Sequence, residues 1–90
     1  MNKYAIAIIG KRYVVVKISK ILAAQPIYHP SAWAKADVLE VVSDEKNWRG
    51  KMFKPGTLIL NCLKDYVTEF EDDDSACLWF ELIKNDLPTA

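Results

Sequence analysis

The sequence contains few of the residues from which catalytic and metal sites are usually built. It has one histidine, His29, two cysteines and three glycines among 90 residues. A single imidazole leaves a His-based metal cluster, and most Cys–His or Ser–His nucleophile systems, without the partners they need. The three glycines stand apart from one another, so the chain has no glycine-rich phosphate loop. We therefore expect a protein that is not an enzyme and that carries no cofactor.

The acidic and sulfur-bearing residues do not predict a metal site either. Asp72, Asp73 and Asp74 are adjacent in the chain, and three neighbouring side chains do not all reach one cation unless a loop is built around it. They indicate a solvated acidic turn. Cys62 and Cys77 lack metal-ligand spacing, and a secreted protein of this size usually has more cysteines. They indicate reduced thiols in a cytoplasmic protein.

Long hydrophobic runs are also absent. No apolar segment approaches the roughly 20 residues that cross a bilayer as a helix. Residues 1–3 lead directly into a strand-like run, which is not the pattern of a signal peptide. We expect no membrane partner.

Charge is balanced over the whole chain but not along it. Residues 1–64 contain eleven lysines and arginines against four acids, a balance of +7, and residues 65–90 contain one lysine against eight acids, a balance of −7. Such a split is typical of a solvated acidic tail, and in a head-to-tail oligomer it would align a basic flank with an acidic one. The basic residues around Tyr13, from Lys11 to Lys20, would suit single-stranded nucleic acid. The acidic C-terminal quarter would repel phosphates, so we expect no nucleic-acid partner.

Two runs near the ends of the chain have strand-like composition and are apolar on both faces. They are residues 4–9 and residues 77–83. A long apolar strand at an exposed edge promotes aggregation, and a neighbouring copy of the same chain is the simplest cover. We therefore expect a homo-oligomer in which these two strands pair between subunits. The predicted interface residues are Tyr4, Ile6, Ile8, Cys77, Trp79 and Phe80.

The rest of the chain indicates short strands at residues 12–18, 37–42, 58–62 and 66–70, with a turn at Lys64 and Asp65 between the last two. Residues 54–57, Lys-Pro-Gly-Thr, fit a type II turn. Residues 75–86 could alternatively form a helix capped by Asp74 or Ser75, but the aromatic and cysteine residues at their centre favour a strand. The prediction is one all-β domain over residues 1–90, a small antiparallel β-barrel.

The order of these parts resembles the GroES-type co-chaperonins, and among them the divergent phage-encoded members. Four stretches carry the likeness. Residues 6–17 are similar to the family's first barrel strands, and residues 36–42 to the strand that leaves its mobile loop. Residues 53–60 are similar to its Gly-containing turn with the strand that follows, and residues 77–87 to its closing strand with a short acidic–apolar tail.

The resemblance implies a heptameric ring that caps a GroEL-type chaperonin and assists ATP-dependent folding in the cytoplasm, the host cytoplasm if the protein is phage-encoded. In this family the closing strand pairs with the opening strand of the next subunit. The mobile loop would be residues 19–33, and its weak contacts would be multiplied over the copies in the ring. Its first-choice chaperonin anchor is Pro26, Ile27 and Tyr28, and its second choice is Ile21 with Leu22. Residues 43–52 would form a roof hairpin, with Trp48 or Arg49 near the opening of the dome.

One alternative comes from another functional class. A small β-barrel of phage type could instead be an inhibitor or adaptor that binds one host protein through a strand edge or through the loop. The mass of the native assembly separates the two hypotheses, because only the co-chaperonin hypothesis requires a heptamer.

Overall fold

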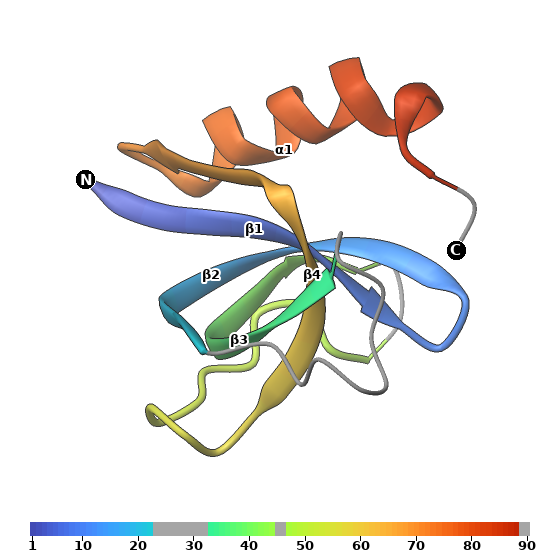
Figure 1. The fold of residues 1–90 in the computed structure, drawn as a ribbon. Helices are drawn as coiled ribbons and strands as arrows, with labels where there is room; N and C mark the ends of the chain where they lie inside the picture. Colours follow the sequence, from blue (N-terminus) through green and yellow to red (C-terminus); the bar gives the residue numbers. More distant parts are fainter. Residues whose placement is uncertain (23–32, 45–46, 89–90) are drawn as a thin grey trace.

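The computed structural model describes residues 1–22, 33–44 and 47–88. Four antiparallel strands close into a ring in the order β1-β2-β3-β4, and one helix lies along the outside (Figure 1). A short 3-10 helix, η1, follows it. The elements are β1 (Asn2–Ile9), β2 (Arg12–Leu22), β3 (Trp33–Ser43), β4 (Ile59–Phe70), α1 (Asp73–Ile83) and η1 (Lys84–Asp86).

The ring closes because β4 pairs with β3 along one edge and with β1 along the other, and Cys62 is registered with both. Its first residues pair with β3, from Ile59 opposite Asp37 to Leu63 opposite Trp33. Its last residues pair with β1, where the register shifts between Ala5 and Ala7. The segment after β3 then returns along the remaining part of that strand, through bonds such as the one from the Phe53 backbone N–H to the Leu39 carbonyl at 2.7 Å. Each of the four strands therefore has partners on both sides.

The interior of the ring is narrow and is filled by small side chains. A closed sheet becomes narrower as its number of strands falls, so four strands leave little room inside. Trp48 and Phe53 pack against this interior cluster from the segment between β3 and β4, with their ring centroids 6.0 Å apart. The buried residues of the cluster are Ala5, Ala7, Val14, Val16, Ile18, Ala34, Ala36, Val38, Val41 and Cys62.

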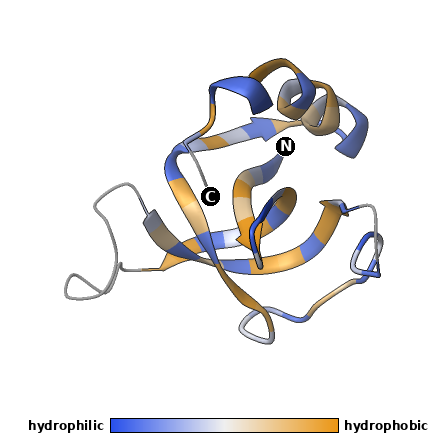
Figure 2. Ribbon diagram, turned by 90° about the vertical axis from the view of Figure 1, so that its right-hand side faces the viewer, coloured by the Kyte–Doolittle hydropathy of each residue, from blue (hydrophilic) through white to orange (hydrophobic). Residues whose placement is uncertain are grey.

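The larger apolar residues lie on the outside of the ring, beneath α1. Figure 2 shows the ring from a second direction, with hydrophobic residues along its strands. Tyr4, Ile6 and Val15 are fully buried on this outer face and form a second cluster with Ala76 of α1. Half-buried aromatic residues complete this cluster, among them Tyr13, Trp33, Phe70, Trp79 and Phe80. β1 and β2 are thus apolar on both faces because the interior buries one face and α1 covers the other.

The prediction of a strand over residues 77–83 is wrong, since these residues form most of α1. The helix begins after Asp72, whose carboxylate accepts a hydrogen bond from the Ser75 backbone N–H at 2.8 Å. Asp73 and Asp74 in the first turn are favourable at the positive end of the helix dipole. No helix in the described part of the chain is both long and apolar enough to cross a membrane.

The reason for predicting that residues 4–9 and 77–83 pair as strands between subunits no longer applies. β1 pairs with β2 on one side and with β4 on the other, both within the same chain. Tyr4 and Ile6, which the sequence predicts at a subunit interface, are fully buried in a single copy, and Ile8 is half-buried. The apolar character of β1 therefore needs no second copy. The oligomeric state itself stays a prediction.

Other sequence predictions have mixed outcomes. The turn at residues 54–57 is confirmed, because Gly56 has φ +84° and the Thr57 backbone N–H donates to the Lys54 carbonyl at 3.0 Å. The prediction of a turn at Lys64 and Asp65 is wrong, since β4 continues through both residues. The coarse prediction of a small, mainly antiparallel β fold is confirmed, with one helix in addition.

A polar cluster fixes the start of α1 to the ring. The Tyr4 hydroxyl donates to Asp73, and the Lys17 ammonium lies 3.2 Å from the same carboxylate and 3.4 Å from that of Glu40. Burial raises the pKa of Tyr4, and its hydrogen bond to Asp73 adds to this. Burial alone would lower the pKa of Lys17, but the Asp73 and Glu40 carboxylates outweigh that effect and raise it. Folding therefore favours a neutral Tyr4 and a charged Lys17.

Replacing Ala7 by leucine tests the narrowness of the ring. Ala7 is fully buried in the interior cluster, so the added methyl groups should force neighbouring strands apart. We expect the free energy of unfolding to fall by about 1–3 kcal/mol, measured by urea unfolding with tryptophan fluorescence. Leu78→Ala, at an exposed position of α1, is the control and should stay within about 0.5 kcal/mol of the parent. A variant Ala7→Leu as stable as the parent would show that the ring has unused space.

Replacing Asp72 by alanine tests the start of the helix. The hydrogen bond from Ser75 lowers the pKa of Asp72, so the carboxylate stabilises the fold above the unfolded-state pKa near 4. That contribution is lost as the pH falls through the lowered, folded-state pKa. We expect Asp72→Ala to lower the thermal unfolding midpoint at pH 7, followed by far-UV circular dichroism, and the difference from the parent to shrink below about pH 4. A difference that is the same at pH 7 and pH 2.5 would contradict the capping role.

Candidate binding groove

Three adjoining hollows mark the end of the ring where the β1–β2 turn, the end of β3 and the middle of α1 meet. Their volumes are about 350, 370 and 210 Å³. The hollows share lining residues: Arg12 and Asp44 join the first to the other two, and Ser43 and Phe80 join the second to the third. We call this continuous surface the Arg12 groove.

Backbone geometry brings the walls of the Arg12 groove together. Gly10 has φ +64°, which the first central position of a two-residue hairpin of this kind requires, and it places Ile9 opposite Arg12. On the other wall, the Ser43 hydroxyl accepts a hydrogen bond from the Val15 backbone N–H at 2.6 Å, at a point where the β2–β3 register shifts. The side chain replaces a ladder bond there, so β3 ends and Asp44 leaves the sheet toward Arg12.

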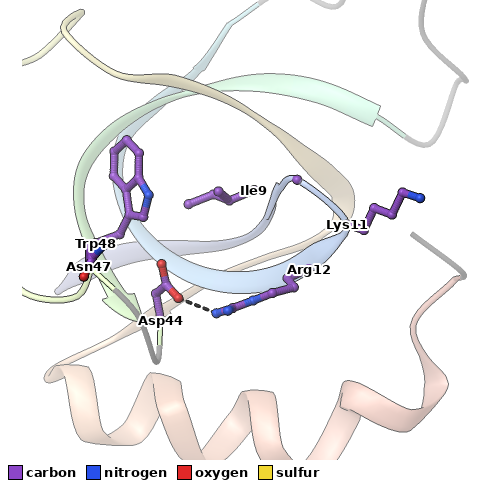
Figure 3. A pocket seen from close by; sticks show the side chains of 7 residues that line it. Ile9, Lys11, Arg12, Asp44, Asn47 and Trp48 are labelled. Carbon is purple, nitrogen blue, oxygen red and sulfur yellow. Dashed lines mark hydrogen bonds and ion pairs between the residues drawn. The ribbon is translucent and has the colours of Figure 1, made fainter.

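An ion pair lies at the centre of the Arg12 groove. The Arg12 guanidinium donates to the Asp44 carboxylate (Figure 3). The Asp44 side chain is only 4% exposed, whereas that of Arg12 is 39% exposed. A mostly buried carboxylate thus holds the arginine in place by a charge-assisted hydrogen bond, while part of the guanidinium still faces solvent. Such a fixed and accessible arginine is suited to bind a carboxylate of another molecule.

The first hollow has an apolar wall. In Figure 3 the Ile9 side chain extends toward the Trp48 indole, and Lys11 points away from both. Contacts on two sides hold Trp48 in place: it packs against the interior cluster, and the Lys51 ammonium lies 5.5 Å from the centroid of its ring. The indole is therefore a supported surface against which an apolar group can pack.

The two cysteines offer no activated nucleophile. Burial inside the ring raises the pKa of Cys62 to about 11. Burial also raises the pKa of Cys77, which lines the third hollow, and the charge of Arg49 only partly offsets this. Both thiols are protonated near neutral pH. Among the described residues, no group of three or more His, Cys, Asp or Glu side chains could hold a metal ion.

The structure brings together residues that the sequence assigns to different predicted sites. Trp48 and Arg49 belong to the predicted roof hairpin, and Cys77 and Phe80 belong to the predicted subunit interface. All four line the Arg12 groove. Trp79, also a residue of the predicted interface, lies instead on the inner side of α1 and packs against Phe70, with their ring centroids 5.7 Å apart.

The predicted mobile loop is only partly described. The first-choice anchor, Pro26, Ile27 and Tyr28, lies outside the described residues, as does His29. The second choice, Ile21 and Leu22, forms the last two residues of β2, where the Ile21 side chain is 38% exposed. Residues 47–52 of the predicted roof contact β3 through two isolated bridges, Glu40 with Met52 and Val41 with Arg49.

Sequence patterns do not single out Arg12, Ser43 and Asp44 as site residues. Arg12 is one of several basic residues around Tyr13, and the other two belong to the predicted roof hairpin. The missing signal is strand register: once Val15 is paired with Ser43, Arg12 and Asp44 must lie at the same end of the sheet.

In comparisons with known proteins, no family model, no curated protein and no solved structure matches the chain. The likeness to co-chaperonins therefore stays a resemblance of sequence.

Replacing Arg12 by alanine tests the ion pair. The substitution removes one partner of a mostly buried carboxylate, so we expect the free energy of unfolding to fall by about 1–2 kcal/mol. The measurement is urea unfolding at pH 7. Lys11→Ala is the matched control, since Lys11 is the neighbouring cation and is exposed; it should change stability by less than about 0.5 kcal/mol. Equal effects of the two substitutions would show that the Arg12–Asp44 pair does not stabilise the fold.

Proposed function

We propose that the protein is a small binding module, of the adaptor or inhibitor kind, which holds a segment of a partner protein in the Arg12 groove. One observation carries this proposal: three adjoining hollows meet around an arginine that a mostly buried carboxylate holds in place. Tryptophan and arginine are enriched among the residues that dominate binding energy at protein interfaces. Here Trp48 and Arg12 line the same hollow.

Recognition through side chains fits a closed ring. A partner peptide can add as an extra strand only where a sheet has an unpaired edge. The strands β1 to β4 have neighbours on both sides, so the described ring offers little edge for this mode. A partner would instead be held in pockets, by groups whose positions the ring fixes.

The charges of the groove favour a peptide over a nucleic acid. Asp44 and Glu81 line it together with three basic side chains, so its charge is mixed in sign. A phosphate backbone would meet two carboxylates there and lose much of its attraction. A peptide that carries a large apolar side chain next to a carboxylate meets complementary groups, with the apolar side chain against Trp48 and the carboxylate on the exposed part of Arg12.

Selection from a displayed library of random peptides tests this function. We expect enriched peptides to combine an aromatic or large aliphatic residue with Asp or Glu. Their affinity, measured by calorimetry, should fall at least tenfold for Arg12→Lys, because lysine lacks the fork that binds a carboxylate bidentately. Trp48→Leu should weaken binding comparably. Lys64→Ala, outside the groove, is the control, and circular dichroism verifies that each variant is folded. Peptides that bind both groove variants as tightly as the parent would overturn the proposal.

The co-chaperonin cap stays a separate prediction from the sequence resemblance. Light scattering on the native protein distinguishes the two functions. A mass of seven subunits, together with ATP-dependent binding to a chaperonin that Ile27→Asp abolishes, would favour the cap. A smaller species that binds groove peptides would favour the binding module.

A further inference from the structure

The outward side of α1 carries an exposed apolar pair among carboxylates. Leu78 is 67% exposed and Leu82 is 82% exposed, and their spacing of four residues places them on one side of the helix. Asp74 lies one turn before Leu78 on the same side, and Glu81 lies beside the pair. Lys84 neutralises part of this charge, since its ammonium is 2.7 Å from the Glu81 carboxylate. We call Asp74, Leu78, Glu81 and Leu82 the α1 face.

A patch of the opposite character lies at the start of β4. Ile59 is 39% exposed, and its position in the register is next to Asp37, which in turn is paired with Lys20. Asp37 is buried, and its carboxylate accepts hydrogen bonds from the Ser19 hydroxyl and the Gly56 backbone N–H. Among the described residues, the exposed lysines Lys20 and Lys54 add positive charge to this part of the surface. We call Lys20, Lys54 and Ile59 the β4 patch.

The two surfaces lie on different sides of the molecule. Figure 1 shows α1 along one side of the ring, and the start of β4 with the turn before it at the opposite end. Along the sequence, residues 1–64, which include the β4 patch, have a balance of +7, and residues 65–90, which include α1, have a balance of −7. Surfaces on opposite sides of one molecule cannot meet each other, but they can meet between copies.

We infer that the α1 face of one copy docks on the β4 patch of a second copy. Apolar groups meet at the centre of this contact, and carboxylates of one copy lie against lysines of the next. A symmetric pairing of two α1 faces would instead bring the carboxylates of Asp74 and Glu81 from both copies into one interface with only Lys84 of each copy to offset them, which is less favourable. The contact is therefore heterologous, head to tail, and repeats into a ring or a chain of subunits. It leaves the Arg12 groove out of the interface and does not rest on the proposed function.

Sedimentation velocity over a micromolar to millimolar concentration range tests the contact. We expect the sedimentation coefficient to rise with concentration at low ionic strength. The rise should be smaller in about 0.5 M salt, because salt screens the flanking charges. Leu78→Asp should weaken association at least tenfold, and so should the double change Lys20→Glu with Lys54→Glu. Lys3→Glu with Lys64→Glu reverses the same number of exposed charges outside the β4 patch and should have less effect. A parent protein that stays monomeric at low salt overturns the inference.

Mixing the two weakened variants shows whether the contact is head to tail. The variant Leu78→Asp keeps an intact β4 patch, and the lysine double variant keeps an intact α1 face. A heterologous contact requires that the mixture form a dimer of one copy of each, with neither variant extending further. A mixture that contains only monomers, or variants that associate as well as the parent does, would overturn the inference. Peptide binding in the groove can be measured on the monomeric variants, so its failure and the failure of this contact are distinguishable.

Discussion

A ring closed by only four strands encloses very little space, and this constraint decides where the large side chains of the protein can lie. Alanine, valine and one cysteine make up almost all of the buried interior cluster. Such small residues bury little apolar area each, so the interior alone gives limited stabilisation. The aromatic residues that could contribute more do not fit inside. Trp48 and Phe53 pack against the interior cluster from the segment between β3 and β4, and the other aromatic residues of the two clusters lie on the outer face, where another element must cover them.

The helix α1 is that cover, and it explains the most distinctive pattern of the sequence. A run that is apolar on both faces correctly predicts that residues 4–9 are a strand covered on both sides. It does not reveal which element provides the cover. The chain supplies it with residues 77–83, which have strand-like composition but follow Asp72 as an effective N-cap. Local capping and the chance to bury Trp79, Phe80 and Ile83 on one side of a helix outweigh the β-propensity of those residues.

The course of β4 shows a second limit of sequence patterns. Lys64 and Asp65 look like a turn because both are polar, yet they lie in the middle of a continuous strand. A ring closes only if its last strand pairs with the first as well as with its predecessor, and β4 does so: residues before the polar pair are registered with β3, Cys62 with both β3 and β1, and the residues from Val67 onward with β1. Both polar residues are exposed, although they lie within the strand. Propensity describes single strands, whereas this feature follows from closure of the ring.

The Arg12 groove was difficult to predict for a related reason. Trp48 could be singled out as an unusual aromatic residue in a polar segment, but its partners come from the β1–β2 turn, the end of β3 and α1. Only the register of β2 against β3 brings Arg12 and Asp44 together, and only the position of α1 adds Phe80 and Glu81. Sequence patterns locate most of the strands, but a site formed where three elements meet depends on their pairing.

The same helix therefore connects the features on which the fold and both proposals depend. Its inner side covers the outer apolar cluster, its edge forms one wall of the Arg12 groove, and its outer side presents Leu78 and Leu82. Its start is tied to β1 and β2 by the contacts of Asp73 with Tyr4 and Lys17. A displacement of α1 would at once expose aromatic residues, open the groove and move the α1 face. Because burial of the outer cluster opposes that displacement, the packing that stabilises this small ring also holds the Arg12 groove and the α1 face in a fixed relation to each other.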